Sequence, residues 1–137
     1  MPANDVPDAE DVKQVIVIRR DLKMRRGKEI AQGAHASGMF LVHAVTATLS
    51  GDAEGAALDE VARVWLTTSL RKVTLQAHSE EQLVALHEAA EGRGLRSHII
   101  RDSGRTEFGG VPTLTALAIG PDLAAAIDEV TGDLTIY

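Results

Sequence analysis

The 137-residue chain is predicted to form a three-layer α/β/α fold around a mixed four-stranded sheet. Strand-like apolar runs alternate with helical segments, a pattern typical of a sheet covered by helices on both faces. Helical segments link the first three strands, which are therefore expected to run parallel to one another. Only an eleven-residue loop precedes the fourth strand. Because that loop is too short for a crossover helix, the fourth strand is predicted to be antiparallel.

The first strand and the helix after it carry the clearest patterns. Residues 13–19 are predicted to form a buried strand, because residues 15–18 are consecutive β-branched apolar residues. A helix is predicted over residues 27–49, and Ser50-Gly51-Asp52 is a favourable stop. Its apolar stripe includes Ile30, Ala34, Leu41, Val45 and Thr48.

The remaining elements follow in order. Residues 53–65 are predicted to form a second helix, with a possible extension to residue 68. A third helix is predicted between the N-cap Ser79, which with Gln82 makes a capping box, and the stop at Gly92. Further strands are predicted over residues 71–76, 95–101 and 113–119, the last closed by Gly120-Pro121. A last helix is predicted over residues 122–130 and a β segment over residues 134–136.

Composition excludes several classes of site. With no cysteine, the chain has no disulfides, thiolate metal sites or thiol nucleophiles. Aromatic residues make up only 3 %, which argues against a base-stacking platform for nucleic acid. No apolar run approaches a membrane span. Residues 1–12 are predicted to be a disordered acidic lead-in and residues 13–137 a single domain. A cytoplasmic location is expected, because the N-terminus is unlike a secretory signal.

A basic loop follows the first strand. Six of the ten residues from Arg19 to Lys28 are Lys or Arg, in a chain whose net charge is −6. A positive loop that leads into a helix N-terminus suits a polyanion such as a phosphodiester backbone. The alternative is a solvated surface loop, because blocks of like charge are often just that.

A candidate site is predicted where the first and third strands end. Lys28, Gln32 and His35 stack along one side of the first helix and are expected to face the loop containing Asp102, Arg105 and Thr106. Each has a structural alternative: Asp102 as a turn former, His35 as a hydrogen-bonded histidine, Gln32 as helix surface, and Thr106 and Thr115 as strand-edge residues. The histidines lack metal-ligand spacing, and no nucleotide-binding signature occurs.

Two multi-residue blocks make the prediction specific. Arg20-Asp21-Leu22-Lys23-Met24, with Gly27-Lys28, Ala31-Gln32 and His35-Ala36, resembles the opening motif of type II peptidyl-tRNA hydrolases. Asp102-Ser103-Gly104-Arg105-Thr106, with Thr115 and Ala118-Ile119-Gly120-Pro121, resembles that family's second motif. The resemblance covers roughly residues 13–137. The chain departs from the pattern at Ser103, usually Ala, and at Glu107, commonly Gln, and its loop over residues 108–114 is about one residue longer.

The resemblance implies hydrolysis of the ester between a peptide and the 3′ end of tRNA, without metal or organic cofactor and commonly by a homodimer. The functional positions that it carries over are Lys28, Gln32, His35, Asp102, Thr106 and Thr115. We expect Lys28 to stabilise the oxyanion and Asp102 to orient the site and to help activate water. Residues expected to hold phosphates of the tRNA acceptor end are Arg19, Arg20, Lys23, Arg25, Arg26 and Arg105. The alternatives are an inactive RNA- or protein-binding module and an enzyme of unrelated chemistry on the same scaffold.

Overall fold

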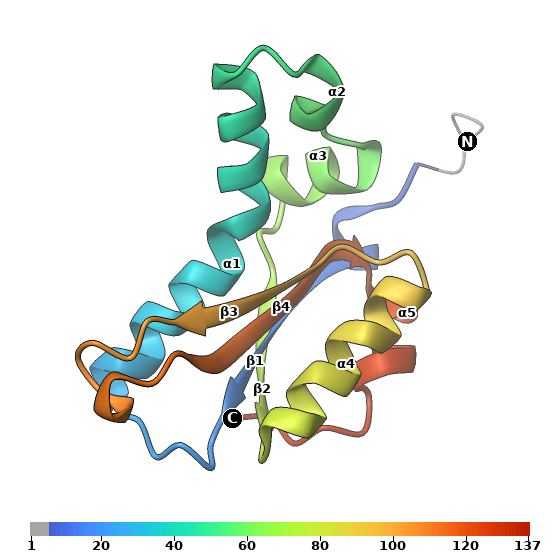
Figure 1. The fold of residues 1–137 in the computed structure, drawn as a ribbon. Coiled ribbons are helices and arrows are strands. Elements are labelled where there is room, and N and C mark those ends of the chain that lie inside the picture. The colour runs from blue at the N-terminus through green and yellow to red at the C-terminus, as the bar shows by residue number, and fades with distance from the viewer. Residues whose placement is uncertain (1–5) are drawn as a thin grey trace.

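The computed structural model, which describes residues 6–137, contains one sheet of four strands (Figure 1). The strands are β1 (Val12–Arg19), β2 (Lys72–Ala77), β3 (Ser97–Asp102) and β4 (Thr113–Leu123), in the order β2-β1-β4-β3. β1 pairs in parallel with β2, and β4 is antiparallel to both β1 and β3. The predicted mixed sheet is confirmed. Because β4 is antiparallel to its two neighbours, β1 and β3 run in the same direction and end at the same edge.

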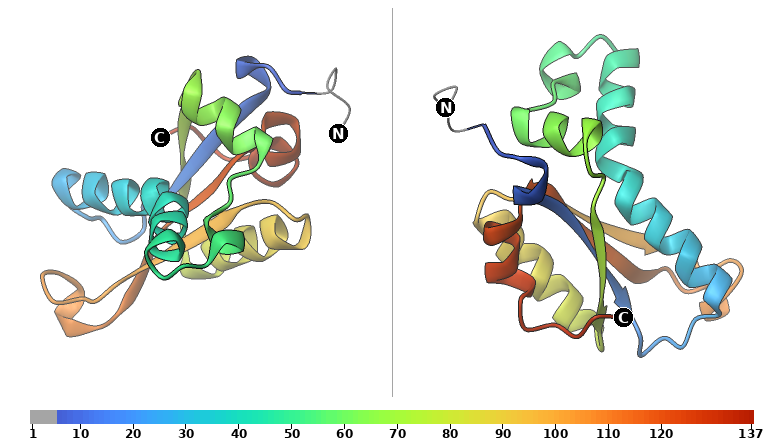
Figure 2. Two further views of the ribbon diagram at one scale, coloured as in Figure 1. Left: turned by 90° about the horizontal axis from the view of Figure 1, so that it is seen from above. Right: turned by 180° about the vertical axis from the view of Figure 1, so that it is seen from behind.

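Helices cover both faces of the sheet, as predicted (Figure 2). On one face, α4 (Glu80–Gly92) and α5 (Ala124–Thr131) pack on the largest core cluster, which includes Val15, Leu83 and Ile127. On the other face, α1 (Arg26–Leu49) crosses the sheet. β1 is buried along almost its whole length because it lies inside the sheet and carries apolar side chains on both faces.

The side of α1 that packs on the sheet differs from the apolar stripe in the sequence. Ile30 and Val45 are 66 % and 56 % exposed, whereas Gln32, Ala36 and Phe40 are buried. The buried polar side chain of Gln32 forms its hydrogen bonds with residues that are distant in the sequence. Helical periodicity does not show where such partners lie, so it could not predict that this side of α1 is buried.

The predicted second helix is wrong in one respect, because it is two helices. α2 (Ala53–Ala56) and α3 (Glu60–Thr67) are separated at Asp59, whose carboxylate accepts a hydrogen bond from the Ala62 backbone N–H. An aspartate that caps a new helix N-terminus stabilises the interruption. α3 places Trp65 edge-on against Phe40 of α1, with ring centroids 5.8 Å apart.

Smaller differences concern the ends of elements. β4 continues through Gly120 to Leu123, past the predicted stop. Ser79 caps α4, but the Gln82 side chain accepts from the His78 N–H rather than from that of Ser79. The lead-in predicted over residues 1–12 lies partly outside the described residues. Its described part is structured, with a short 3₁₀ turn over Ala9–Asp11 before β1 begins.

Candidate active site

The edge at which β1 and β3 end brings Lys28, Asp102 and Thr106 together. Lys28, in the first turn of α1, donates from Nζ to Oδ1 of Asp102 at 2.9 Å and to Oγ1 of Thr106 at 3.0 Å. Asp102 is the last residue of β3, and Thr106 lies in the loop that follows. The Lys28 and Asp102 side chains are only 14 % and 12 % exposed, so water screens this ion pair weakly.

The Asp102 carboxylate accepts three hydrogen bonds. Besides Lys28, Oδ1 accepts from the Gln32 amide at 3.4 Å, and Oδ2 accepts from the Gly104 backbone N–H at 2.9 Å. The hydrogen bond from Lys28, followed by that from Gly104, holds the pKa of Asp102 below its ordinary value. Asp102 is therefore ionised near neutral pH and is a weak base. The geometry favours the orienting role expected for it over proton abstraction from water.

Gly104 is required by the turn after Asp102. Its φ is +83°, and a Cβ at this position would lie 2.3 Å from the Val111 carbonyl oxygen. Only glycine fits both constraints. Asp102 is thus both a turn former, through Oδ2, and the partner of Lys28, through Oδ1.

Gln32 and Thr115 lie behind the cleft rather than on its surface. Gln32 is 3 % exposed and Thr115 is fully buried. The Thr115 hydroxyl donates to the Gln32 side-chain oxygen, which turns the Gln32 amide N–H₂ toward Asp102. Neither side chain reaches the surface of the cleft, although the resemblance carried over both as functional positions. Their burial gives them a supporting position beneath Asp102.

His35 and Arg105 are near the site but outside its hydrogen-bonded centre. Both side chains are exposed. His35 makes the smallest of the electrostatic contributions to the lowered pKa of Asp102 and is not hydrogen-bonded to it. The Arg105 backbone N–H donates to the Ser103 hydroxyl at 3.4 Å.

Arg19 does not belong to the phosphate-binding set. It is 8 % exposed, its guanidinium forms two hydrogen bonds with Asp21, and it donates to the Leu114 carbonyl oxygen at 2.9 Å. The hydrogen bond from Arg19 lowers the pKa of Asp21. Because its donors are used inside the protein, Arg19 is left out of the phosphate-binding set proposed below. Lys23, Arg25 and Arg26 are exposed, and Arg20 is partly exposed.

An ion pair that the sequence did not predict joins the two loops of the site. Arg25 is 2.9 Å from Oε1 of Glu107, and their side chains are 81 % and 19 % exposed. A cleft of about 480 Å³ lies here, lined by Arg25, Gly27, Lys28, Ala31 and Thr106. Opposite charges at loop positions 25 and 107 were visible in the sequence, but their separation along the chain concealed the contact.

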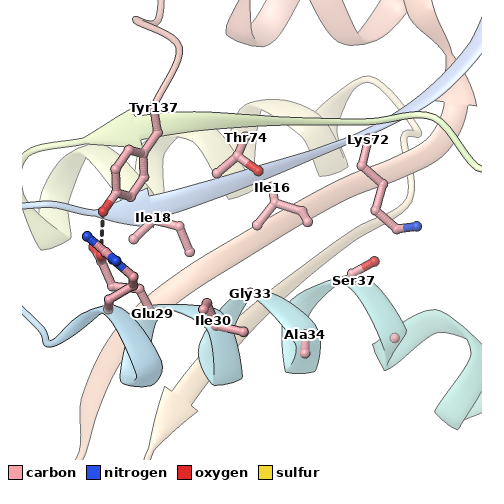
Figure 3. Close-up of a pocket in the computed structure, with 12 residues that line it drawn as sticks. Ile16, Ile18, Glu29, Ile30, Gly33, Ala34, Ser37, Lys72, Thr74 and Tyr137 are labelled. Carbon is pink, nitrogen blue, oxygen red and sulfur yellow. Dashed lines mark hydrogen bonds between the residues drawn. The ribbon is translucent and has the colours of Figure 1, made fainter.

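A larger groove of about 700 Å³ lies on another side of α1, between that helix and β1 and β2 (Figure 3). Its floor is apolar, with Ile16, Ile18 and Ile30, and it lacks the Lys28–Asp102 pair. The smaller cleft is therefore the candidate active site. Among residues 6–137, no group of three or more His, Asp or Glu side chains is placed to hold a metal ion. No described helix is long and apolar enough to span a membrane.

Similarity to known proteins decides the family. The family model for peptidyl-tRNA hydrolase PTH2 matches residues 12–137. The chain belongs to the PTH2 family. A peptidyl-tRNA hydrolase from Methanopyrus kandleri is 45 % identical over 124 residues, which span 90 % of this chain and 97 % of that protein. One from Methanocaldococcus jannaschii is 39 % identical over 126 residues, spanning 91 % and 99 % of the two chains.

A PTH2 relative and a solved structure extend the comparison. A probable peptidyl-tRNA hydrolase 2 from Dictyostelium discoideum is 40 % identical over 131 residues, which span 93 % of this chain and 55 % of that protein. The structure of a protein of unknown function, Atu0240 from Agrobacterium tumefaciens, superposes with a TM-score of 0.52 at 12 % identity. It covers 93 % of this chain and 98 % of its own, and indicates a shared fold only.

Proposed function

We propose that this chain hydrolyses the ester that joins a peptide to the 3′ end of tRNA, releasing tRNA for reuse in translation. Membership of the PTH2 family supports the reaction. The observation that carries the proposal is the placement of Lys28 at the cleft, held by Asp102 and Thr106 beside a loop rich in exposed basic residues.

In the proposed reaction, water attacks the ester carbonyl carbon directly. The Lys28 ammonium stabilises the negative charge that develops on the carbonyl oxygen. Asp102 holds Lys28 in place, and the exposed Thr106 hydroxyl orients water or the terminal ribose. The tetrahedral intermediate then collapses and the bond to the tRNA 3′ oxygen breaks. One proton of the attacking water ends on that oxygen, and the other is lost to solvent as the peptide carboxylate is released.

The exposed basic side chains are proposed to hold phosphates of the tRNA acceptor end. This set comprises Arg20, Lys23, Arg25, Arg26 and Arg105. Binding through several phosphates releases counterions, so affinity should fall steeply with salt. A flat salt dependence of tRNA affinity would refute this part of the proposal.

The direct test uses purified protein and N-acetyl-aminoacyl-tRNA, with release of the N-acetyl amino acid as readout. Turnover, together with competition by uncharged tRNA, is expected. If the protein binds tRNA without releasing the amino acid, the hydrolase proposal fails and a binding module becomes the better description. The names of the relatives reported above give no support to that alternative.

We also propose that the protein is a homodimer and acts in the cytoplasm, where translation takes place. α1 exposes Ile30, Val42, Val45 and Leu49, each more than half exposed, and the apolar groove lies next to Ile30. Large exposed apolar side chains gathered on one element are typical of a protein interface. Light scattering after size exclusion should give twice the chain mass, and Val45→Asp should shift it toward the monomer. A monomeric wild type would contradict the dimer.

A further inference from the structure

Three segments that are distant in the sequence meet at one end of the apolar groove. They are the end of β1 at Arg20, the first turn of α1 at Glu29, and the C-terminal residue Tyr137. The Tyr137 hydroxyl donates to Oε1 of Glu29, and Arg20 Nε lies 3.5 Å from Oε2 of the same carboxylate. Figure 3 shows the Tyr137 ring pointing down from the C-terminal segment to Glu29 on α1. The Arg20 guanidinium carbon lies 3.9 Å from the centre of the Tyr137 ring.

Glu29 requires these partners because it is buried. It is 8 % exposed, directly follows Lys28, and lies beside the apolar groove. A buried carboxylate without a partner would carry a large desolvation cost. The Tyr137 hydroxyl and the Arg20 cation therefore help to fix the first turn of α1, the turn that presents Lys28 to the cleft.

Backbone pairing holds Tyr137 in a defined place. Its N–H donates to the Thr74 carbonyl oxygen at 2.9 Å, and Ile136 forms an antiparallel bridge with Leu75. The Gln76 side-chain amide donates to the Ile136 carbonyl oxygen at 3.0 Å. The ring of Tyr137 is thus held beside the sheet, where it forms a surface for the Arg20 guanidinium.

The Arg20 guanidinium has the Glu29 carboxylate and the Tyr137 ring as its neighbours. Within residues 6–137, its Nε is buried without a hydrogen-bond partner, while the side chain as a whole remains 37 % exposed. A guanidinium that stacks on an aromatic face keeps its edge N–H groups free to bind an anion.

We propose that Tyr137 is a positioning residue for tRNA binding: its ring holds the Arg20 guanidinium ready for a phosphate, and its hydroxyl fixes Glu29 beside Lys28. This inference rests on the proposed function. An arginine that is already ordered loses less side-chain entropy when it binds phosphate, so the stacked arrangement increases affinity.

A double-mutant cycle between Tyr137 and Arg20 tests the inference. Affinity for tRNA is measured over a range of salt concentrations for the wild type, Tyr137→Leu, Arg20→Ala and the double variant. We expect Tyr137→Leu to weaken binding about 3- to 10-fold. Arg20→Ala should reduce the salt slope by about 0.9, the value for one phosphate contact. The double variant should bind no more weakly than Arg20→Ala alone.

Two further variants separate positioning from a structural role. Arg20→Lys keeps the charge but lacks the planar guanidinium, so it should bind about 3- to 10-fold more weakly with an unchanged salt slope. Ile136→Ala is the matched control, because that side chain is 70 % exposed in the same segment, and its affinity should equal that of the wild type.

The outcomes distinguish this inference from the proposed function. Additive losses in the cycle, or wild-type affinity in Arg20→Lys, would overturn the positioning role even if hydrolysis is normal. The Arg20→Lys result stands even if Tyr137→Leu does not fold. A wild type that neither binds tRNA nor releases the amino acid would overturn both.

Discussion

Replacing Lys28 by alanine removes the cation that faces the cleft. The ammonium is held at 2.9 Å from Asp102 and 3.0 Å from Thr106, so its position is fixed before substrate arrives. A preorganised donor of this kind is typically worth about 10²–10³ in rate. We expect Lys28→Ala to lower kcat by about that factor and to change KM much less, since exposed basic residues supply most of the phosphate contacts.

The same replacement should lower the stability without preventing folding. In Lys28→Ala, Asp102 keeps its hydrogen bond from Gly104 at 2.9 Å and the longer one from Gln32. The hydrogen bonds from Lys28 to Asp102 and to Thr106 are both lost. Loss of the charged contact with Asp102 costs about 1.5–3 kcal/mol, which is less than the roughly 5–15 kcal/mol by which folded domains are stable. The variant should therefore fold, and its loss of turnover should not reflect unfolding.

Asp102→Asn perturbs the pair from the other side. The carboxylate accepts from Lys28, Gln32 and Gly104, but an asparagine amide offers only one oxygen. One donor then faces the N–H₂ group, and a loss of about 2–3 kcal/mol of stability is expected. Lys28 also loses its fixed position, so kcat should fall by about 10²-fold or more.

The assay is release of N-acetyl amino acid from N-acetyl-aminoacyl-tRNA, with kcat and KM measured separately and urea unfolding in parallel. Lys72→Ala is the matched control, because it removes the same type of side chain from the amino end of β2, at the opposite edge of the sheet. It should retain both constants. Wild-type turnover in a folded Lys28→Ala protein would refute the role of Lys28.

Three further predictions concern other charged groups. Glu107 pairs with Arg25 and so competes with tRNA phosphates for it. Glu107→Gln should therefore tighten tRNA binding about 3- to 10-fold at low salt, with a smaller gain at high salt. Equal tRNA affinities of the variant and the wild type would contradict this competition. The hydrogen bond to Glu29 raises the pKa of Tyr137, the chain's only tyrosine. Its stabilising effect should therefore persist below the ordinary value of 10.0 and disappear as pH rises through the raised pKa. The tyrosinate absorbance should titrate above its ordinary range, and Glu29→Gln should move it back. Burial, and then nearby positive charge, lower the pKa of His98 from 6.5 to about 4, so stability should fall as pH drops between these values. Urea unfolding at about pH 7.5 and about pH 5 should show that His98→Gln loses about 1 kcal/mol less on acidification than the wild type does.

Local patterns in the sequence predicted most of the fold. Residues 15–18 are four consecutive β-branched apolar residues, enough to predict a buried strand, and the short loop before residue 113 predicted the antiparallel fourth strand. Strand direction then placed Lys28 and Asp102 at one edge, because both follow the carboxyl ends of strands that run the same way. These inferences depend only on periodicity, loop length and chain direction.

Only the tertiary structure decided which polar side chains are buried and which residues are their hydrogen-bond partners. Periodicity along α1 marked Ile30 as part of its apolar stripe, yet Glu29 and Gln32 are the buried residues. Their partners, Tyr137 and Thr115, lie far away in sequence. The free energy of burying a polar group depends on its hydrogen-bond partner, and a partner supplied by a distant segment leaves no local pattern.

The basic loop shows the same division. The sequence alone determined that positive charge is concentrated between Arg19 and Lys28. The folded chain decided that Arg19 pairs with Asp21, Lys28 with Asp102 and Arg25 with Glu107. It also left Lys23 and Arg26 exposed and Arg20 partly exposed. The charge of a side chain follows from its residue type. Whether that charge can reach a ligand depends on whether the side chain is buried and whether it is already paired with an opposite charge of the protein.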